Sequence, residues 1–196
     1  MSKTALLLSG GVDSCALSYW KKPDVAITID YGQASAAGEI RAASQIALEL
    51  DMPHEVVRVD CSALGSGDLA LKPSIVDAPA PEWWPYRNQL LVTIAAMKLM
   101  PQGVTSLMVG SVKSDSFHVD GRAEFYDALD RVVQMQEGGI RVVAPGLAFS
   151  AVELVRQSGV PSSLIGWTHS CHKAQYACGN CRGCWKRQNV LDELGW

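Results

Sequence analysis

The sequence predicts an α/β fold: a doubly wound parallel sheet with a cysteine-rich C-terminal segment. Strand-length apolar runs alternate with longer helical patterns, a glycine-rich turn joins the first run to the first helix, and four cysteines cluster near the C-terminus. Such alternation is typical of crossover units that place neighbouring strands parallel. At 196 residues the chain has room for one substantial core. We therefore expect one domain, with residues 1–168 as the α/β body and residues 169–196 as a cysteine knuckle and C-terminal helix.

Five strands and five helices account for most of this body. The predicted strands are Thr4–Leu8, Val25–Ile29, Glu55–Val59, Ser106–Val109 and Arg141–Ala144. The predicted helices are Ser14–Lys21, Ser35–Leu50, Arg87–Met100, Arg122–Met135 and Ala151–Ser158. The last helix has a capping box, because Ser150 is followed three residues later by Glu153 and the pair satisfies free backbone N–H groups.

Residues 61–85 are predicted to form a long loop. They are rich in Gly, Pro and Ser and show no clear hydrophobic period. Loops of this length in compact domains are usually functional lids or disordered segments. The position directly before Arg87-Asn88 favours a lid over the alternative, an inert surface loop.

Composition and charge restrict the classes of function. Hydrophobic residues make up 48% of the chain and charged residues 19%, as in ordinary globular proteins. The formal net charge of -3 gives no overall attraction to nucleic acid or to anionic membranes. The apolar stretches fall well short of the roughly 20 residues needed to cross a bilayer, and no signal-peptide pattern is evident. We expect a small-molecule substrate and a cytoplasmic location, with no membrane or nucleic-acid partner.

The strongest motif is the hexapeptide Ser9-Gly10-Gly11-Val12-Asp13-Ser14, between the first strand and the first helix. Its glycines allow close backbone approach, and its serines and the helix N-terminus supply donors for a tetrahedral oxyanion. Walker loops and Rossmann fingerprints need a different glycine spacing. The motif predicts a pyrophosphate-binding loop with Asp13 as a candidate Mg²⁺ ligand. A plain strand-to-helix turn is the alternative.

A second polar group follows the second strand. Asp30-Tyr31-Gly32-Gln33 ends that strand, and Glu39 comes six residues after Gln33. Open α/β sheets bind ligands at the carboxyl ends of their strands. These residues are therefore predicted to line the nucleotide site, although such a turn is also common in proteins without any catalytic activity.

Four cysteines form the pattern Cys-x6-Cys-x2-Cys-x2-Cys. Four closely spaced thiolates suit tetrahedral Zn²⁺ and leave no open coordination position, which predicts a structural metal. An iron–sulfur cluster uses the same ligands and stays an alternative. His169 and His172 flank the first cysteine and are interpreted as site-lining residues, while Cys15 and Cys61 are interpreted as structural. The predicted ligands are Cys171, Cys178, Cys181 and Cys184.

The hexapeptide resembles the loop of the PP-loop ATP pyrophosphatases, which have an adenine nucleotide alpha hydrolase-like fold and adenylate a carbonyl or carboxyl oxygen. Other motifs follow it along most of the chain, and together they resemble the 7-cyano-7-deazaguanine synthase family. The resemblance implies ATP, Mg²⁺ and Zn²⁺, the substrates 7-carboxy-7-deazaguanine and ammonia, a role in queuosine biosynthesis, and a homodimer. The motifs that carry it are Ser9–Ser14, Asp30–Gln33, Pro85-Tyr86-Arg87-Asn88, Gly110, Asp115, Asp120, Arg122, Phe125 and the cysteines.

The resemblance also implies roles for single residues. Asp13, Ser14 and Arg87 are the candidate catalytic residues. Arg87 could hold a carboxylate or phosphate with two hydrogen bonds, and Asn88 could orient a partner. Asp115 and Asp120 could read a guanine-like edge, since a carboxylate accepts two N–H bonds. Arg122 completes the predicted substrate set, with a solvated surface position as the alternative for it and for both aspartates.

The chain departs from the family at four places. Two are spacings: the stretch before Asp120 is one residue shorter, and the spacing after Cys171 is two residues shorter. Ala34-Ser35 stand where the family has Arg-His, and Ala151 stands where it has a lysine beside the phosphates. Losing that cation would affect the second step, from amide to nitrile, more than the first, and Lys113 or Lys173 are candidate replacements.

Two other functions stay open. One is another PP-loop adenylation, such as sulfur insertion into tRNA or the use of a different amine. The other is a non-catalytic nucleotide- or deazapurine-binding paralogue. The lack of a basic, aromatic-rich appendage argues against an RNA substrate. Pyrophosphate release would distinguish an enzyme from a binding protein.

Overall fold

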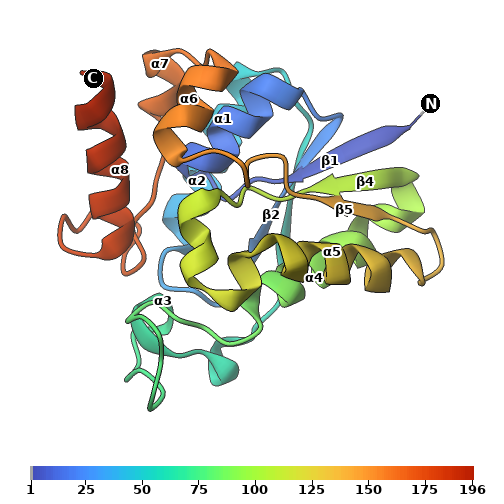
Figure 1. Ribbon diagram of the computed structural model, residues 1–196, viewed down its shortest axis with the longest axis horizontal. Helices are drawn as coiled ribbons and strands as arrows, with labels where there is room; N and C mark the ends of the chain where they lie inside the picture. Colours follow the sequence, from blue (N-terminus) through green and yellow to red (C-terminus); the bar gives the residue numbers. More distant parts are fainter. Residues whose placement is uncertain (1) are drawn as a thin grey trace.

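A five-stranded parallel sheet forms the centre of the computed structural model (Figure 1). The structure describes residues 2–196; Met1, part of the predicted unit 1–168, lies outside the described residues. The strand order is β3-β2-β1-β4-β5, and every neighbouring pair is parallel. This confirms the predicted doubly wound sheet. The strands are β1 (Lys3–Leu7), β2 (Val25–Asp30), β3 (His54–Arg58), β4 (Val104–Met108) and β5 (Arg141–Val143).

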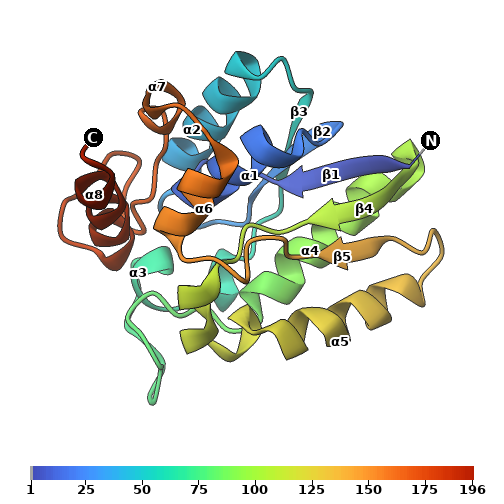
Figure 2. The same cartoon turned by 45° about the horizontal axis from the view of Figure 1, so that its top comes forward.

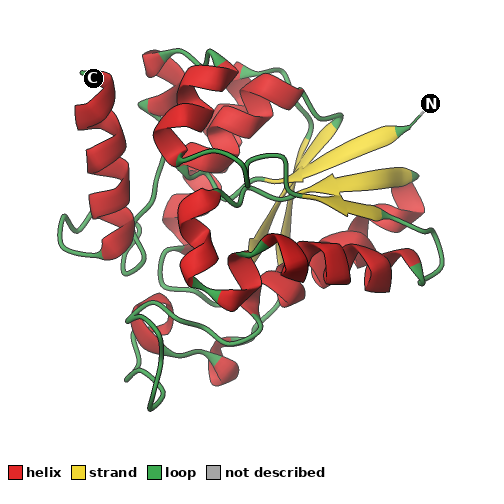
Figure 3. Ribbon diagram, viewed as in Figure 1, coloured by secondary structure: helices red, strands yellow, loops and turns green. Residues whose placement is uncertain are grey.

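Helices follow the strands and cover both faces of the sheet (Figure 3). The α-helices are α1 (Val12–Lys21), α2 (Ala36–Glu49), α3 (Gly67–Ala70), α4 (Arg87–Leu99), α5 (Ala123–Gln134), α6 (Ala151–Ser158), α7 (Ser162–Ile165) and α8 (Arg182–Leu194). Short 3-10 turns are η1 (Ser62–Leu64), η2 (Met100–Gln102), η3 (Lys113–Phe117) and η4 (Val119–Gly121). Within residues 2–196, no helix combines the length and apolar character that crossing a membrane requires.

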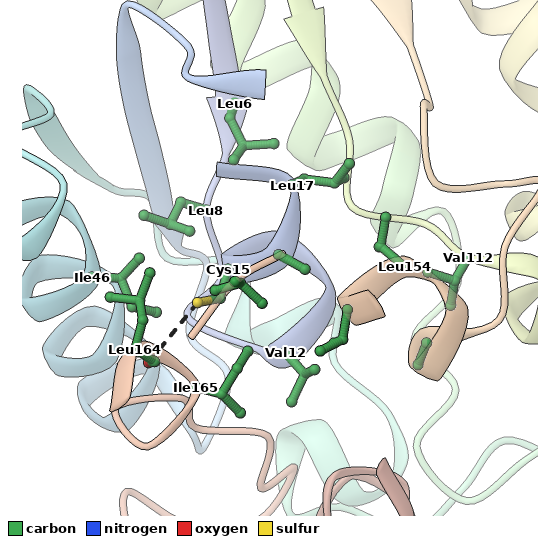
Figure 4. Packing of buried hydrophobic residues seen from close by; sticks show 14 of the residues in the cluster. Leu6, Leu8, Val12, Cys15, Leu17, Ile46, Val112, Leu154, Leu164 and Ile165 are labelled. Carbon is green, nitrogen blue, oxygen red and sulfur yellow. Dashed lines mark hydrogen bonds between the residues drawn. The ribbon is translucent and has the colours of Figure 1, made fainter. Parts of the chain in front are cut away.

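The alternation of side chains along β1 divides the core between the two faces. Leu6 packs with residues of α1, α2, α6 and α7 on one face, and its neighbour Ala5 packs with α4 and α5 on the other. Successive strand residues point to opposite faces, so a strand covered on both sides must be apolar throughout. Figure 2 shows the two helical layers, and Figure 4 shows the first cluster at close range. α8 packs against α6 and adds the buried Val190 to this cluster.

Most predicted boundaries agree with the structure to within two residues. α6 covers Ala151–Ser158 as predicted, and its capping box is present: Ser150 Oγ accepts from Glu153 N over 3.2 Å. In return, Ser150 N donates to Glu153 Oε2 over 2.7 Å. The segment expected to be a loop contains η1 and α3, and the short helix α7 was not predicted. Helices of three or four residues carry too little periodicity to be recognised in a sequence.

Candidate active site and cysteine cluster

A cavity of about 350 Å³ lies at the carboxyl ends of β1 and β4. The strand order makes this the switch point of the sheet, because the chain runs from β1 outward to β2 and β3 and then returns to the other side as β4. Connections leave a switch point in opposite directions and open a crevice there, which is where doubly wound proteins bind ligands. The fold therefore places the cavity beside the predicted phosphate loop.

The hexapeptide forms a tight turn between β1 and α1. Ser14 Oγ donates to the Gly11 carbonyl over 3.1 Å and lies 3.2 Å from Ser9 Oγ. Gly10 has a φ of +76°, and a Cβ there would come within 2.7 Å of the Ala42 side chain on α2. Glycine is required because any larger residue would push the loop away from α2. The turn presents Ser9, Gly11, Asp13 and Ser14 to the cavity.

Asp13 is joined to the C-terminal helix by an ion pair that no local motif predicts, because its partner is 173 residues away in the sequence. Lys186 Nζ lies 2.9 Å from Asp13 Oδ2 and 3.1 Å from Asp115 Oδ1. Burial raises the pKa of Asp13, and the Lys186 ammonium group opposes that shift. Burial alone would lower the pKa of Lys186, but the two carboxylates outweigh it and raise that pKa. All three residues line the cavity.

The end of β2 contributes one of its four predicted residues directly to the cavity. Tyr31 and the later Glu39 line the cavity, and burial raises the pKa of both. Gln33 lies behind them, where its amide donates to Glu39 Oε2 over 3.0 Å and its carbonyl accepts from Tyr31 N over 2.9 Å. Asp30 accepts from Gly32 N over 3.2 Å and is not among the lining residues. Gln33 and Asp30 thus shape this turn from outside the cavity.

Arg87 and Asn88 begin α4 and line the cavity together with Asp115 and Asp120. Asn88 Nδ2 donates to the Asp120 carbonyl over 2.9 Å, which holds η4 against α4. Burial alone would lower the pKa of Arg87, but Tyr31, Asp120 and other acidic neighbours raise it above its ordinary value. A permanently charged guanidinium therefore faces the cavity.

Arg122 takes a different position from the other predicted substrate residues. It is exposed, and its Nε donates to the Ser116 carbonyl over 3.1 Å. It lies outside the lining of the cavity. Neither Lys113 nor Lys173 lines the cavity either, whereas Ala151 does.

The long loop contributes a buried carboxylate that sequence reasoning missed. Glu82 Oε1 lies 3.0 Å from Arg182 Nη1 of α8 and 3.7 Å from His118 Nε2. The other oxygen, Glu82 Oε2, is buried without a hydrogen-bond partner. All three residues line the cavity, so the loop covers part of the site as a lid would. No local motif marks Glu82, because its partners come from distant segments.

The four cysteine sulfurs converge at the start of α8. Their Sγ atoms all lie within 4.8 Å of one another, with 3.9 Å between Cys178 and Cys184 and 3.9 Å between Cys171 and Cys181. Sulfurs of a tetrahedral site with bonds of about 2.3 Å to zinc would stand roughly 3.8 Å apart. The cluster could therefore hold a metal ion, as the spacing predicted. Cys181 also caps α8, since its Sγ accepts from Cys184 N over 3.4 Å.

The histidines and the remaining cysteines occupy the positions expected of them. His169 and His172 line the cavity and lie outside the four-cysteine cluster. Burial lowers the pKa of His172 to about 4. Cys15 is buried in the core beside Leu164 (Figure 4), and burial raises the pKa of its thiol to about 12, which favours the protonated thiol of a structural cysteine. Cys61 packs at the edge of the second core cluster.

Comparison with known proteins assigns the chain to a family. The family model described as "Queuosine biosynthesis protein QueC" matches residues 3–195. A 7-cyano-7-deazaguanine synthase from Desulforudis audaxviator is 33% identical and covers 98% of this chain and 98% of its own length. One from Methanoculleus marisnigri is 31% identical over 100% and 96%. One from Aliarcobacter butzleri is 28% identical over 98% and 92%. Because the match spans nearly the whole of both sequences, the chain belongs to the QueC family of queuosine biosynthesis proteins.

Proposed function

We propose that this protein is an ATP-dependent 7-cyano-7-deazaguanine synthase. It adenylates the carboxylate of 7-carboxy-7-deazaguanine and transfers the activated carbon to ammonia, giving the amide and then the nitrile. The observation that carries the proposal is a shared cavity: the Ser9–Ser14 loop and the Arg87-Asn88 pair line the same space. A phosphate-binding turn and a group suited to a carboxylate must face each other for adenylate formation.

At one end of the cavity, the loop would bind the phosphate groups of ATP. The hydroxyls of Ser9 and Ser14 and the N-terminus of α1 offer donors to phosphate oxygens. Asp13 would hold Mg²⁺, and its Oδ1 atom, buried without a hydrogen-bond partner, is free to do so. When bound, Mg²⁺ would offset the charge that develops as pyrophosphate leaves. Tyr31 and Glu39, with Asp30, Gly32 and Gln33 behind them, would form the nucleotide side of the cavity.

Next to the loop, charged groups that line the same cavity would bind the deazaguanine. Arg87 would hold the substrate carboxylate near the α-phosphate, and Asn88 would fix the position of Asp120. Asp115 and Asp120 would accept the N–H groups of the guanine-like edge. Arg122 would act from outside the cavity, by holding η3 through its bond to the Ser116 carbonyl.

The proposal includes a structural Zn²⁺ bound by the four cysteines. A set of four thiolates suits zinc and leaves no position open for a substrate. Reduced thiols of this kind are stable in the cytoplasm, which is where we place the protein. A homodimer, the assembly that the family resemblance implies, is part of the proposal and can be tested by sedimentation.

Product analysis tests the function. The protein is mixed with ATP, Mg²⁺, 7-carboxy-7-deazaguanine and ammonium, and the products are identified by mass spectrometry. We expect AMP, pyrophosphate and the nitrile, with the amide as the intermediate. Omitting the deazaguanine should stop AMP formation, and Asp13→Asn serves as the inactive control. Binding of the deazaguanine without AMP formation would instead identify a non-catalytic paralogue, and accumulation of amide alone would show that the second activation fails.

A further inference from the structure

Lys186 occupies an unusual place for a residue of the C-terminal helix. It reaches from the first turns of α8 to Asp13 in the phosphate loop, a separation of 173 residues in sequence. It also contacts Asp115 of η3, so that one ammonium group bridges two carboxylates. The Lys186 side chain is 37% exposed, and it lines the same cavity as the two carboxylates. The ammonium group therefore borders the space that a ligand would occupy.

Two of the three other cations that line the cavity are held by partners outside the phosphate loop. Among residues 2–196, the lining cations are Arg87, Arg182, Lys186 and Arg187. Arg182 pairs with Glu82, and Arg187 donates to Thr168 Oγ1 over 2.9 Å. Arg87 faces the cavity from α4 and contacts Asn88 Oδ1 over 3.3 Å. Lys186 is therefore the cation that α8 places against the phosphate loop, through its hydrogen bond to Asp13.

The charges change when a nucleotide enters. Two carboxylates at the mouth of a phosphate loop would repel ATP unless a cation stood between them. If Mg²⁺ takes Asp13, the ammonium group loses its shortest ion pair and becomes available to the phosphate oxygens. A lysine ammonium group has three rotatable donors and adapts readily to such an exchange of partners.

We propose that Lys186 is a phosphate-binding residue of the ATP site, paired with Asp13 and Asp115 in this structure and transferred to the phosphate groups when Mg²⁺ and nucleotide bind. This inference rests on the proposed function, because it takes ATP as the substrate. It adds a residue that no motif of the phosphate loop contains. α8 positions it, since Lys186 follows the cysteine cluster by two residues and Cys181 caps the same helix.

Binding of inorganic pyrophosphate tests the inference without turnover. Titration calorimetry in the presence of Mg²⁺ compares the unchanged protein with Lys186→Met and Lys186→Arg. We expect the methionine variant to bind pyrophosphate roughly 10- to 100-fold more weakly, the range for one hydrogen bond to a charged group. The arginine variant, which keeps the charge, should recover part of that loss.

Lys98→Met is the matched control. Lys98 is also ion-paired, 3.2 Å from Glu55, and its side chain is 47% exposed, but it lies outside the cavity lining. It should bind pyrophosphate like the unchanged protein. Zinc content and the circular dichroism spectrum should stay the same in all variants, which separates a loss of phosphate contact from damage to α8.

Two results would overturn the inference. Equal pyrophosphate affinity in the unchanged protein and Lys186→Met would remove Lys186 from the phosphate site while leaving the proposed synthase intact. Equal weakening in Lys186→Met and Lys98→Met would show that the loss of any one positive charge has the same effect. If the unchanged protein did not bind pyrophosphate at all, the ATP site and the proposed function would be overturned together. That result differs from the first two, in which the unchanged protein binds pyrophosphate.

Discussion

Arg182 and Glu82 form an ion pair of 3.0 Å that joins the long loop to the start of α8. A second pair, Lys173 with Asp68 at 3.2 Å, connects the same loop to the cysteine-rich segment. Both cations belong to the cysteine-rich segment, between Cys171 and Cys184. That segment therefore also holds the loop in place over the cavity.

Breaking the first of these contacts should loosen the loop. In Arg182→Met, Glu82 would stay buried without its cation, which is unfavourable for a carboxylate that already has one unpartnered oxygen. We expect limited proteolysis within residues 61–85 to become several-fold faster. Lys98→Met removes a surface ion pair of 3.2 Å with Glu55 and serves as the control. Cleavage at the same rate in all three proteins would show that the ion pair does not hold the loop.

Metal binding and local folding should be coupled at the cysteine cluster. Elemental analysis is expected to find about one Zn²⁺ per chain, because four thiolates complete a tetrahedral site. Cys181→Ser removes a ligand and the cap of α8 at once, so metal content and melting temperature should both fall. Cys61→Ser, outside the cluster, should keep its metal. A Cys181→Ser protein with full metal content would contradict this assignment.

The phosphate loop should be essential for turnover and dispensable for folding. Asp13→Ala and Ser14→Ala are each expected to lower the rate of pyrophosphate release by on the order of 10²-fold or more, as loss of a well-placed transition-state contact does. Circular dichroism should stay unchanged, since both side chains face the cavity. Asp127→Ala, on the exposed side of α5, is the control. Near-normal release in both loop variants would exclude the loop from the reaction.

Asp130 should make stability depend on pH at the edge of the sheet. Burial would raise its pKa, but hydrogen bonds from Arg141 and from Val142 N–H lower it below its ordinary value. A depressed pKa contributes stability above the unfolded value of about 3.9, and that stability is lost as the pH falls through the folded pKa.

Asp130→Asn measures this contribution. At pH 7 the variant should be less stable by about 1 kcal/mol, a value reduced for the solvent that screens the exposed Arg141. The difference between the two proteins should begin to shrink below about pH 4, where this carboxylate becomes protonated in the unfolded chain, and it is lost as the pH falls through the lower folded pKa. Urea unfolding at pH 7 and at pH 3 tests this. A difference that is constant over this range would assign the effect to packing rather than to charge.

The sequence by itself determined the parts of this protein that depend on local spacing. The parallel α/β architecture follows from the alternation of apolar runs and helical patterns, because each element must bury its apolar side. The glycine-rich turn after β1, the capping box at Ser150 and the four-cysteine cluster each lie within about 14 residues, so neighbouring positions specify their geometry. Family membership follows from the same motifs taken in order.

The tertiary structure alone decided which distant side chains meet at the cavity. It brings Lys186 to Asp13 across 173 residues and Arg182 to Glu82 across 100 residues. It also places Tyr31 inside the cavity and Asp30, one residue earlier, outside it. Neither result can be read from a motif, because such pairs depend on how α8 packs on α6 and on the direction in which each side chain leaves the turn after β2. The packing of whole helices and strands sets those positions, and it cannot be predicted from the spacing of neighbouring residues.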